Sequence, residues 1–165
     1  MKLPNLRSYA LFLAILLSAI SASAGYSSID RSGFYAAYTS ASIDGINNFI
    51  SKLENGSSSE SKAFLGALLM RKSGLLNNKK EQLNLFKKGR MLLEKEIETS
   101  PNNAEFRFLR ITIQEQAPKI LGYNKNLEQD KKVLVKGFKD LNQETQKAIL
   151  GYVQKSRLLK STDLN

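Results

Sequence analysis

The sequence contains no cysteine and no histidine. Without cysteine, no disulfide can form and no thiol can take part in redox chemistry. Cysteine and histidine are also the commonest ligands of transition metals in proteins. Their absence excludes structural zinc, haem held by histidine and thiol redox chemistry, and we expect no cofactor. The fold must be stabilised by packing without covalent or metal cross-links.

Signatures of catalysis are also missing. Histidine is the usual general base, and the chain has neither a Gly-x-Ser-x-Gly turn nor a Gly-x-x-x-x-Gly-Lys phosphate loop. Mechanisms that use a Ser–Lys pair or two carboxylates need no histidine and stay formally open. We nevertheless expect a protein that is not an enzyme, because no serine near a lysine lies in a supporting pattern.

Long apolar runs are rare, and the longest lies at the N-terminus. Lys2 and Arg7 flank the start of the apolar run 9–20, and Ala22-Ser23-Ala24 gives the small-x-small pattern of a signal-peptidase site. Because spanning a bilayer takes about 20 apolar residues, the run predicts a cleaved signal peptide over residues 1–24, with an uncleaved anchor as the alternative. We expect an exported protein, periplasmic first and secreted as the alternative, with no transmembrane segment in the mature chain.

Apolar residues recur at helical spacing through most of the mature chain, and strand patterns are almost absent. In the stretch 79–100, Phe86 and Leu93 lie on one side of a helix, while Leu85 and Leu92 lie on the other. A helix with two apolar faces is most simply sandwiched between neighbours. Seven helices are predicted, at residues 31–38, 43–53, between the serines at 57–59 and Gly74, and at 79–100, 103–116, 127–138 and 142–159.

The sequence therefore predicts an all-α fold. It is a single domain of about seven helices stacked as antiparallel hairpins, with residues 25–57 forming weaker N-terminal helices and residues 58–165 the helical core. The pattern Gly89-x-x-x-Leu93-x-x-Glu96-x-x-x-x-Pro101-Asn-Asn resembles the second helix and terminal turn of a tetratricopeptide repeat. The preceding helix lacks the aromatic and Leu-Gly positions of that repeat, so the resemblance implies a degenerate helical stack.

A longer resemblance covers about half of the mature chain, from Ala63 to Lys132. It includes the segment RFLRITIQ at 107–114, followed by Pro118 and the pair Leu121-Gly122. These features resemble a group of short exported helical proteins of bacteria that carry an RFLR-x-x-I-Q motif. The resemblance implies export and a helical fold, and it brings no activity with it.

Basic residues gather in one part of the sequence. Between positions 62 and 90, eight basic residues stand against one acid, Glu81, and the chain without its first 24 residues has 23 basic and 15 acidic side chains, a net charge of +8. The favoured interpretation is a solvated surface. The alternatives are a patch for an acidic protein or for anionic lipid headgroups, with nucleic acid last because no recognition motif is present. The binding candidates are Arg71, Lys72, Lys79, Lys80, Lys87, Lys88 and Arg90.

A second group of candidates lies on the helix predicted at 103–116. Arg107, Arg110 and Gln114 stand at i, i+3 and i+7 and share one edge of that helix. An arginine fork at the rim of a groove could hold a carboxylate or a phosphate. The favoured interpretation is that these arginines pair with acids of adjacent helices, such as Glu94 or Asp130, and we expect Arg90 to pair with Glu94 within its own helix.

The functional hypothesis from the sequence is a non-enzymatic binding or scaffold protein of the cell envelope. A protein-interaction module is favoured, since stacked helix pairs build concave surfaces suited to a peptide or an envelope protein. The alternative is a carrier or surface binder for an anionic lipid or another anionic small molecule. A structural protein without a fixed ligand is the third possibility.

Overall fold

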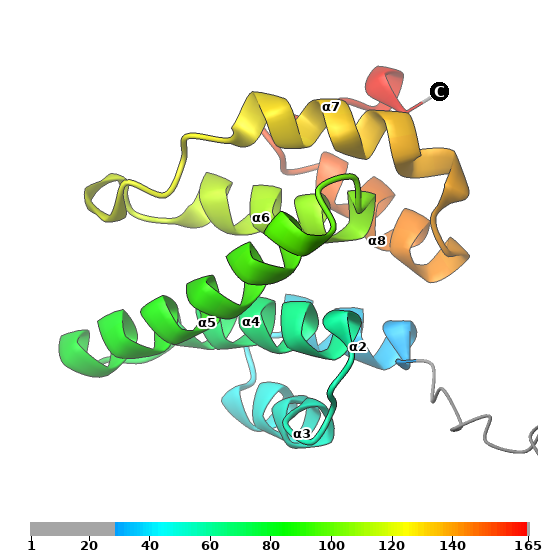
Figure 1. Cartoon of the computed structure of the whole chain (residues 1–165). Coiled ribbons are helices and arrows are strands. Elements are labelled where there is room, and N and C mark those ends of the chain that lie inside the picture. Colours follow the sequence, from blue (N-terminus) through cyan, green and yellow to red (C-terminus); the bar gives the residue numbers. More distant parts are fainter. Residues whose placement is uncertain (1–28, 165) are drawn as a thin grey trace, which may run out of the picture.

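A computed structural model describes residues 29–164, and the predicted signal peptide lies outside them. The described part is all-α, as the sequence predicts, with seven α-helices and three short 3-10 turns (Figure 1). None of these helices is both long and apolar enough to span a membrane. The elements are α2 (Arg31–Thr39), α3 (Ile43–Leu53), α4 (Ser59–Ser73), α5 (Lys79–Thr99), α6 (Ala104–Gln116), η1 (Lys119–Leu121), α7 (Leu127–Gly137), η2 (Phe138–Asp140), α8 (Gln143–Val153) and η3 (Ser161–Asp163).

Most helices begin at a side-chain cap that the sequence makes recognisable. The Ser58 hydroxyl accepts from the Ser61 amide at the start of α4, and the Asn103 side chain accepts from the Phe106 amide at the start of α6. Asn142 caps α8 in the same way. Such caps satisfy backbone amides that have no partner within the helix. The capped starts agree with the predicted positions within about one residue.

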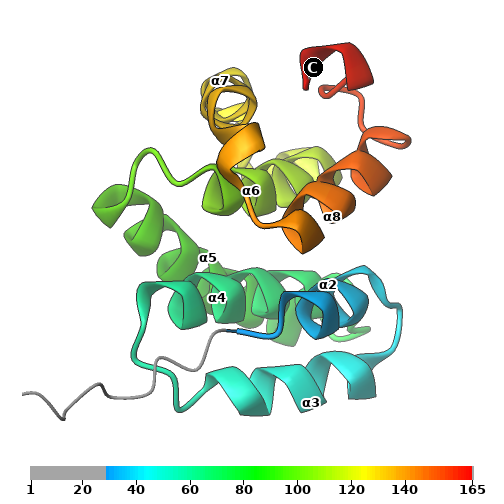
Figure 2. The ribbon, with the colours of Figure 1, turned by 90° about the vertical axis from the view of Figure 1, so that its right-hand side faces the viewer.

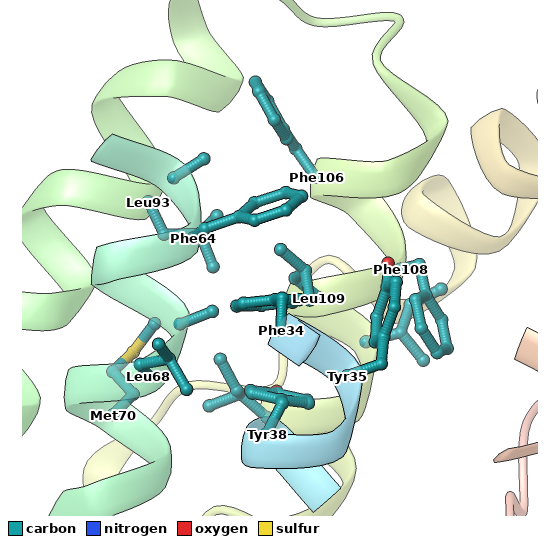
Figure 3. Packing of buried hydrophobic residues seen from close by; sticks show 14 of the residues in the cluster. Phe34, Tyr35, Tyr38, Phe64, Leu68, Met70, Leu93, Phe106, Phe108 and Leu109 are labelled. Atoms are coloured by element: carbon teal, nitrogen blue, oxygen red, sulfur yellow. The ribbon is translucent and has the colours of Figure 1, made fainter. Parts of the chain in front are cut away.

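The helices form two groups stacked one above the other. Helices α2 to α5 make the lower group in Figure 2, and α6, α7 and α8 make the upper one. Helix α6 is the central element, because every residue from 104 to 114 is buried. Phe34 of α2, Phe64 of α4 and Phe106 of α6 belong to one core, in which the rings of Phe34 and Phe64 stack with centroids 4.2 Å apart (Figure 3).

Helices α4 and α5 cross with their backbones in contact. A methyl group added to Gly89 of α5 would lie 2.5 Å from the carbonyl oxygen of Gly66 in α4 and 2.9 Å from the Met70 amide nitrogen. Both are backbone atoms, so a side chain at this position would push the helices apart. Gly89 is the small residue of the repeat-like pattern, and its role in the structure is this close crossing.

The last helix is shorter than the sequence predicts. We expected a helix to residue 159, whereas α8 ends at Val153. The Glu115 carboxylate of α6 accepts hydrogen bonds from the amides of Arg157 and Leu158 at 2.7 and 3.1 Å, and from the Ser156 hydroxyl at 2.7 Å. These amides cannot serve a helix at the same time. A charged acceptor outside the helix therefore ends it, and sequence periodicity does not show such a contact.

Candidate functional site

A cleft of about 950 Å³ opens between the helices of the described part of the molecule. Side chains of α2 and α8 line it on opposite sides, the C-terminal half of α6 contributes to its floor, and the α4–α5 turn and the loop after α6 close one end. In Figure 2, α8 lies above α2. Pockets that hold small molecules usually measure about 300–1,000 Å³, so this cleft lies at the large end of that range.

Aromatic side chains from three helices make the floor of the cleft. Phe108 of α6 meets the Tyr152 ring of α8 edge to face at 5.7 Å, and the Tyr35 ring of α2 at 6.2 Å. The hydroxyls of Tyr38 and Thr112 are hydrogen-bonded at 2.6 Å. Burial raises the pKa of Tyr38 to about 12, so its phenol stays neutral at physiological pH. The floor is thus a neutral surface of rings whose polar atoms are already satisfied.

A buried carboxylate beneath this floor fixes α2 relative to α8. Glu105 of α6 accepts from the Tyr35 hydroxyl at 2.9 Å, from Thr145 of α8 at 2.6 Å and from the Arg31 guanidinium of α2. Burial first, and then the charge of Glu105, raise the pKa of Tyr35 well above its ordinary value. Because each carboxylate oxygen has a donor, this network holds the two walls of the cleft at a set spacing.

The end of the cleft beside α5 is lined mainly by aliphatic side chains, with the ring of Phe86 among them. Phe86 is buried there, Leu83 is partly exposed, and Ile113 belongs to the core. Ile120 of η1 stands at the mouth with 93% of its surface exposed. Gly122, which follows η1, has a φ of +58°. This left-handed conformation suits glycine and turns the loop back toward α7. A ligand in the cleft would meet aromatic rings at one end and aliphatic side chains at the other.

The rim of the cleft carries more positive than negative charge. Arg71 donates to the carbonyl oxygens of Tyr38 and Ser40 at 3.1 and 3.2 Å, which fixes its guanidinium at the end of α2. The other charged residues on the rim are Lys79, Lys147, Lys155 and Glu144, of which Lys147 and Glu144 pair at 2.9 Å on the surface. The four cations and one acid favour an anionic group at the opening.

The structure divides the basic residues that the sequence grouped. Arg71 and Lys79 line the main cleft. Lys87 and Arg90 border a shallower depression of about 410 Å³ beside Tyr123. Lys72, Lys80 and Lys88 line neither. Residues adjacent on a helix point in different directions, so a count of charges along the sequence does not define a face.

The expected pair between Arg90 and Glu94 was wrong. The Arg90 guanidinium lies 4.9 Å from the centre of the Tyr123 ring, within the range of a cation–π contact. The Glu94 carboxylate instead accepts from Arg110 at 2.6 Å and from the Tyr123 hydroxyl. The Tyr123 ring packs against Phe86, and its burial raises its pKa above the ordinary value.

Arg107, Arg110 and Gln114 form a buried polar cluster between α6 and α7. All three donate to Asp130, which is fully buried: Arg107 Nη1 at 2.8 Å, Arg110 Nε at 2.7 Å and Gln114 Nε2 at 3.2 Å. Arg107 also donates to the Pro101 carbonyl oxygen. This is the pairing with neighbouring acids that the sequence favoured, and it directs these side chains between two helices and away from the cleft.

Sequence reasoning missed the cleft residues of α2 and α8, above all Tyr38, Tyr152 and Gly151. Their helical spacing indicated apolar faces, but periodicity alone does not tell which part of such a face a neighbouring helix leaves uncovered. A weak signal was available, because a glycine inside the predicted last helix costs stability and often has a packing or functional reason.

The chemistry of the cleft suits binding. Across residues 29–164, no three acidic side chains lie close enough together to hold a metal ion. No family model, no curated protein and no solved structure matches the chain. Fold and cleft together define an all-α protein with an aromatic, positively rimmed cavity.

Proposed function

We propose that the protein is an exported, non-enzymatic binding protein that holds an elongated, largely apolar ligand with an anionic group in the cleft between α2 and α8. The observation that carries the proposal is the combination of an aromatic floor and a basic rim around one cavity of about 950 Å³. An apolar body would be removed from water against Phe108 and Tyr152, and the anionic group would lie at the rim.

The cavity supports a small amphiphilic ligand over a protein surface. Specific protein partners usually bury about 800 Å² on each side and use a broad interface, whereas this cleft is concave and bounded by helices on several sides. The arginines of α6 that a groove-bound partner was expected to meet are engaged with Asp130. The protein-interaction module therefore stays a prediction, and the carrier of an anionic amphiphile is the function we put forward.

The charges at the opening select the kind of ligand. Lys155 reaches the rim from the end of α8, where its ammonium group lies 5.6 Å from the centre of the Tyr152 ring. Lys147 is 61% exposed in its pair with Glu144 and can turn to another anion at little cost. A carboxylate or phosphate at this point would be drawn in by charge, while the tail supplies most of the affinity.

A substitution at Gly151 tests the cleft directly. Gly151 lines the cleft, and nothing lies within 4 Å of a methyl group added there. Gly151→Trp should therefore place an indole ring in part of the cavity, while Gly151→Ala should leave it open. We expect 11-(dansylamino)undecanoic acid to bind the wild type and Gly151→Ala with equal affinity, and Gly151→Trp at least about tenfold more weakly.

Two controls make the result specific. Leu150→Trp adds the same ring one residue away at an exposed position that does not line the cleft, and it should bind the probe normally. Replacing Lys147 and Lys155 together by methionine should weaken this anionic probe but not neutral N-phenyl-1-naphthylamine. If Gly151→Trp keeps a wild-type circular dichroism spectrum and binds the probe as tightly as Gly151→Ala, the cleft is not the binding site.

A further inference from the structure

Exposed large apolar side chains concentrate on one part of the described surface. Of the four in residues 29–164, Leu83, Met91 and Ile120 belong to α5 and the loop 117–126, with exposed fractions of 41%, 66% and 93%, and only Leu150 lies elsewhere. Single exposed apolar residues are ordinary on protein surfaces. Three in neighbouring elements require a reason, because a cluster of this kind marks a contact surface.

Basic side chains surround the same three residues. We define the α5–loop surface as Lys79, Leu83, Lys87, Arg90 and Met91 of α5 with Lys119, Ile120 and Lys125 of the loop. At about 100° per residue, the five α5 positions fall within an arc of about 120° on one side of the helix.

The two elements adjoin along their length. Lys79 and Leu83 line the same cavity as Ile120, and Arg90 and Met91 border the same depression as Lys125. In Figure 1 the start of α5 and the loop between α6 and α7 both lie at the left end of the molecule.

Cations outnumber acids on this surface. Glu94 and Glu98 border the same depression as Lys87, Arg90 and Lys125. Glu94 accepts from Arg110 and Tyr123, and Glu98 pairs with Lys95 at 3.8 Å. Five cations therefore stand beside three exposed apolar side chains, and about 4 to 8 basic residues are enough to support binding to anionic lipid.

We propose that the α5–loop surface docks on an anionic phospholipid bilayer, with Ile120 inserted among the headgroups and the surrounding lysines and Arg90 facing lipid phosphates. An almost fully exposed isoleucine on a turn, with lysines on both sides, suits a fluid interface that closes around it without a preformed pocket. An acidic protein would have to supply such a pocket, and an acidic polymer would leave Ile120 and Met91 in water.

The docking surface also meets the mouth of the cleft. Leu83 and Ile120 both line the aliphatic end of that cavity, so a docked molecule would present this end to the bilayer. A membrane-derived amphiphile could then enter tail first. The inference stands without the proposed ligand, however, because the exposed side chains and charges of the α5–loop surface carry it by themselves.

The experiment uses the mature protein, shown by mass spectrometry to lack the apolar segment 9–20, and vesicles of phosphatidylcholine with or without 30% phosphatidylglycerol. We expect flotation with the anionic vesicles only, with at least about tenfold weaker binding in 0.5 M NaCl. The chain has no tryptophan, so Ile120→Trp introduces a single reporter. Its emission should shift to the blue on anionic vesicles and be quenched by brominated acyl chains, whereas Leu150→Trp should show neither effect.

Matched variants separate docking from general attraction. Met91→Ser, at an exposed position of the α5–loop surface that does not line the cleft, should lower vesicle binding at least about fivefold while leaving the dansyl probe in the cleft, and Gly151→Trp should do the reverse. Replacing Lys119 and Lys125 by glutamine should reduce binding more than the same replacement at Lys136 and Lys139, which are also exposed but lie at the opposite end of α7 (Figure 1). Absent flotation, equal effects of the two lysine pairs, or binding only to a soluble acidic peptide would overturn the proposal.

Discussion

The crossing of α4 and α5 gives a prediction in which one substitution has opposite effects at two sites. Gly89 and Gly151 both lie within helices. At Gly151 a methyl group meets no atom within 4 Å, whereas at Gly89 it would lie 2.5 Å from the Gly66 carbonyl oxygen. Replacing a helical glycine by alanine is worth up to about 1 kcal/mol in helix propensity at both sites. Only the packing term differs.

At Gly89 the packing term outweighs the gain in propensity. The nearest atoms belong to the backbone of α4 and cannot move without displacing the helix, and forcing extra atoms into a packed core costs about 1–3 kcal/mol or more. We expect Gly89→Ala to lower the free energy of unfolding by about 1–2 kcal/mol and Gly151→Ala to raise it by up to about 1 kcal/mol. For a domain of this size the two melting temperatures should differ by about 3–12 °C.

Urea unfolding followed by circular dichroism at 222 nm, with calorimetry on the same samples, measures both variants against the wild type. Gly66→Ala provides an internal check, since its methyl group would lie 2.7 Å from the Gly89 carbonyl oxygen and it should resemble Gly89→Ala. If Gly89→Ala proves as stable as Gly151→Ala, the helices do not cross at these glycines.

Three further outcomes are expected. Asp130→Asn leaves two buried arginines without their carboxylate and should lower the free energy of unfolding in urea by about 3–5 kcal/mol. Glu144→Gln, in an exposed pair, should lower it by less than about 1 kcal/mol, and equal losses would contradict the buried cluster. Because the pKa of Tyr38 is raised to about 12, folding favours its neutral form, so stability is unaffected below about pH 10 and falls as the pH rises from 10 to 12. Tyr38→Phe should flatten that fall, and an unchanged pH profile of stability would refute the assignment. Glu115→Ala should speed hydrogen exchange at the Arg157 amide by about tenfold or more, since a hydrogen bond to a charged group contributes about 1.5–3 kcal/mol, and unchanged protection would mean that another contact ends α8.

Local features of the sequence were sufficient for the helices and for one of the polar clusters. A cap such as Asn103 acts within four residues, so the start of α6 follows from the chain itself. The acids that pair with Arg110 could also be named in advance, because a buried arginine needs a carboxylate and few were in reach. Both predictions depend on polar groups that have few possible partners.

The remainder depended on contacts between distant segments. Within residues 154–159 the Ser156 hydroxyl accepts from the amides of Leu158 and Leu159, but the carboxylate that holds this serine and the amides of Arg157 and Leu158 is Glu115, about 40 residues earlier. The same holds for Arg90. Its guanidinium lies over the Tyr123 ring because Glu94 pairs with Arg110. Where a side chain has two acceptable partners, the packing of the helices decides between them.

The arrangement of buried and exposed charge explains why the candidate sites lie where they do. The arginines of α6 are held between helices by Asp130 and Glu94, so their positive charges are matched by carboxylates and α6 can serve as a rigid floor. Glu105 holds α2 and α8 to that floor through Tyr35 and Thr145, which keeps the walls of the cleft from closing on their aromatic side chains. The lysines at the cleft rim and on the α5–loop surface can meet an anion without the cost of breaking a buried pair. Because Arg107 and Arg110 are confined to buried pairs while the two candidate sites use surface cations, stability and binding can be perturbed separately.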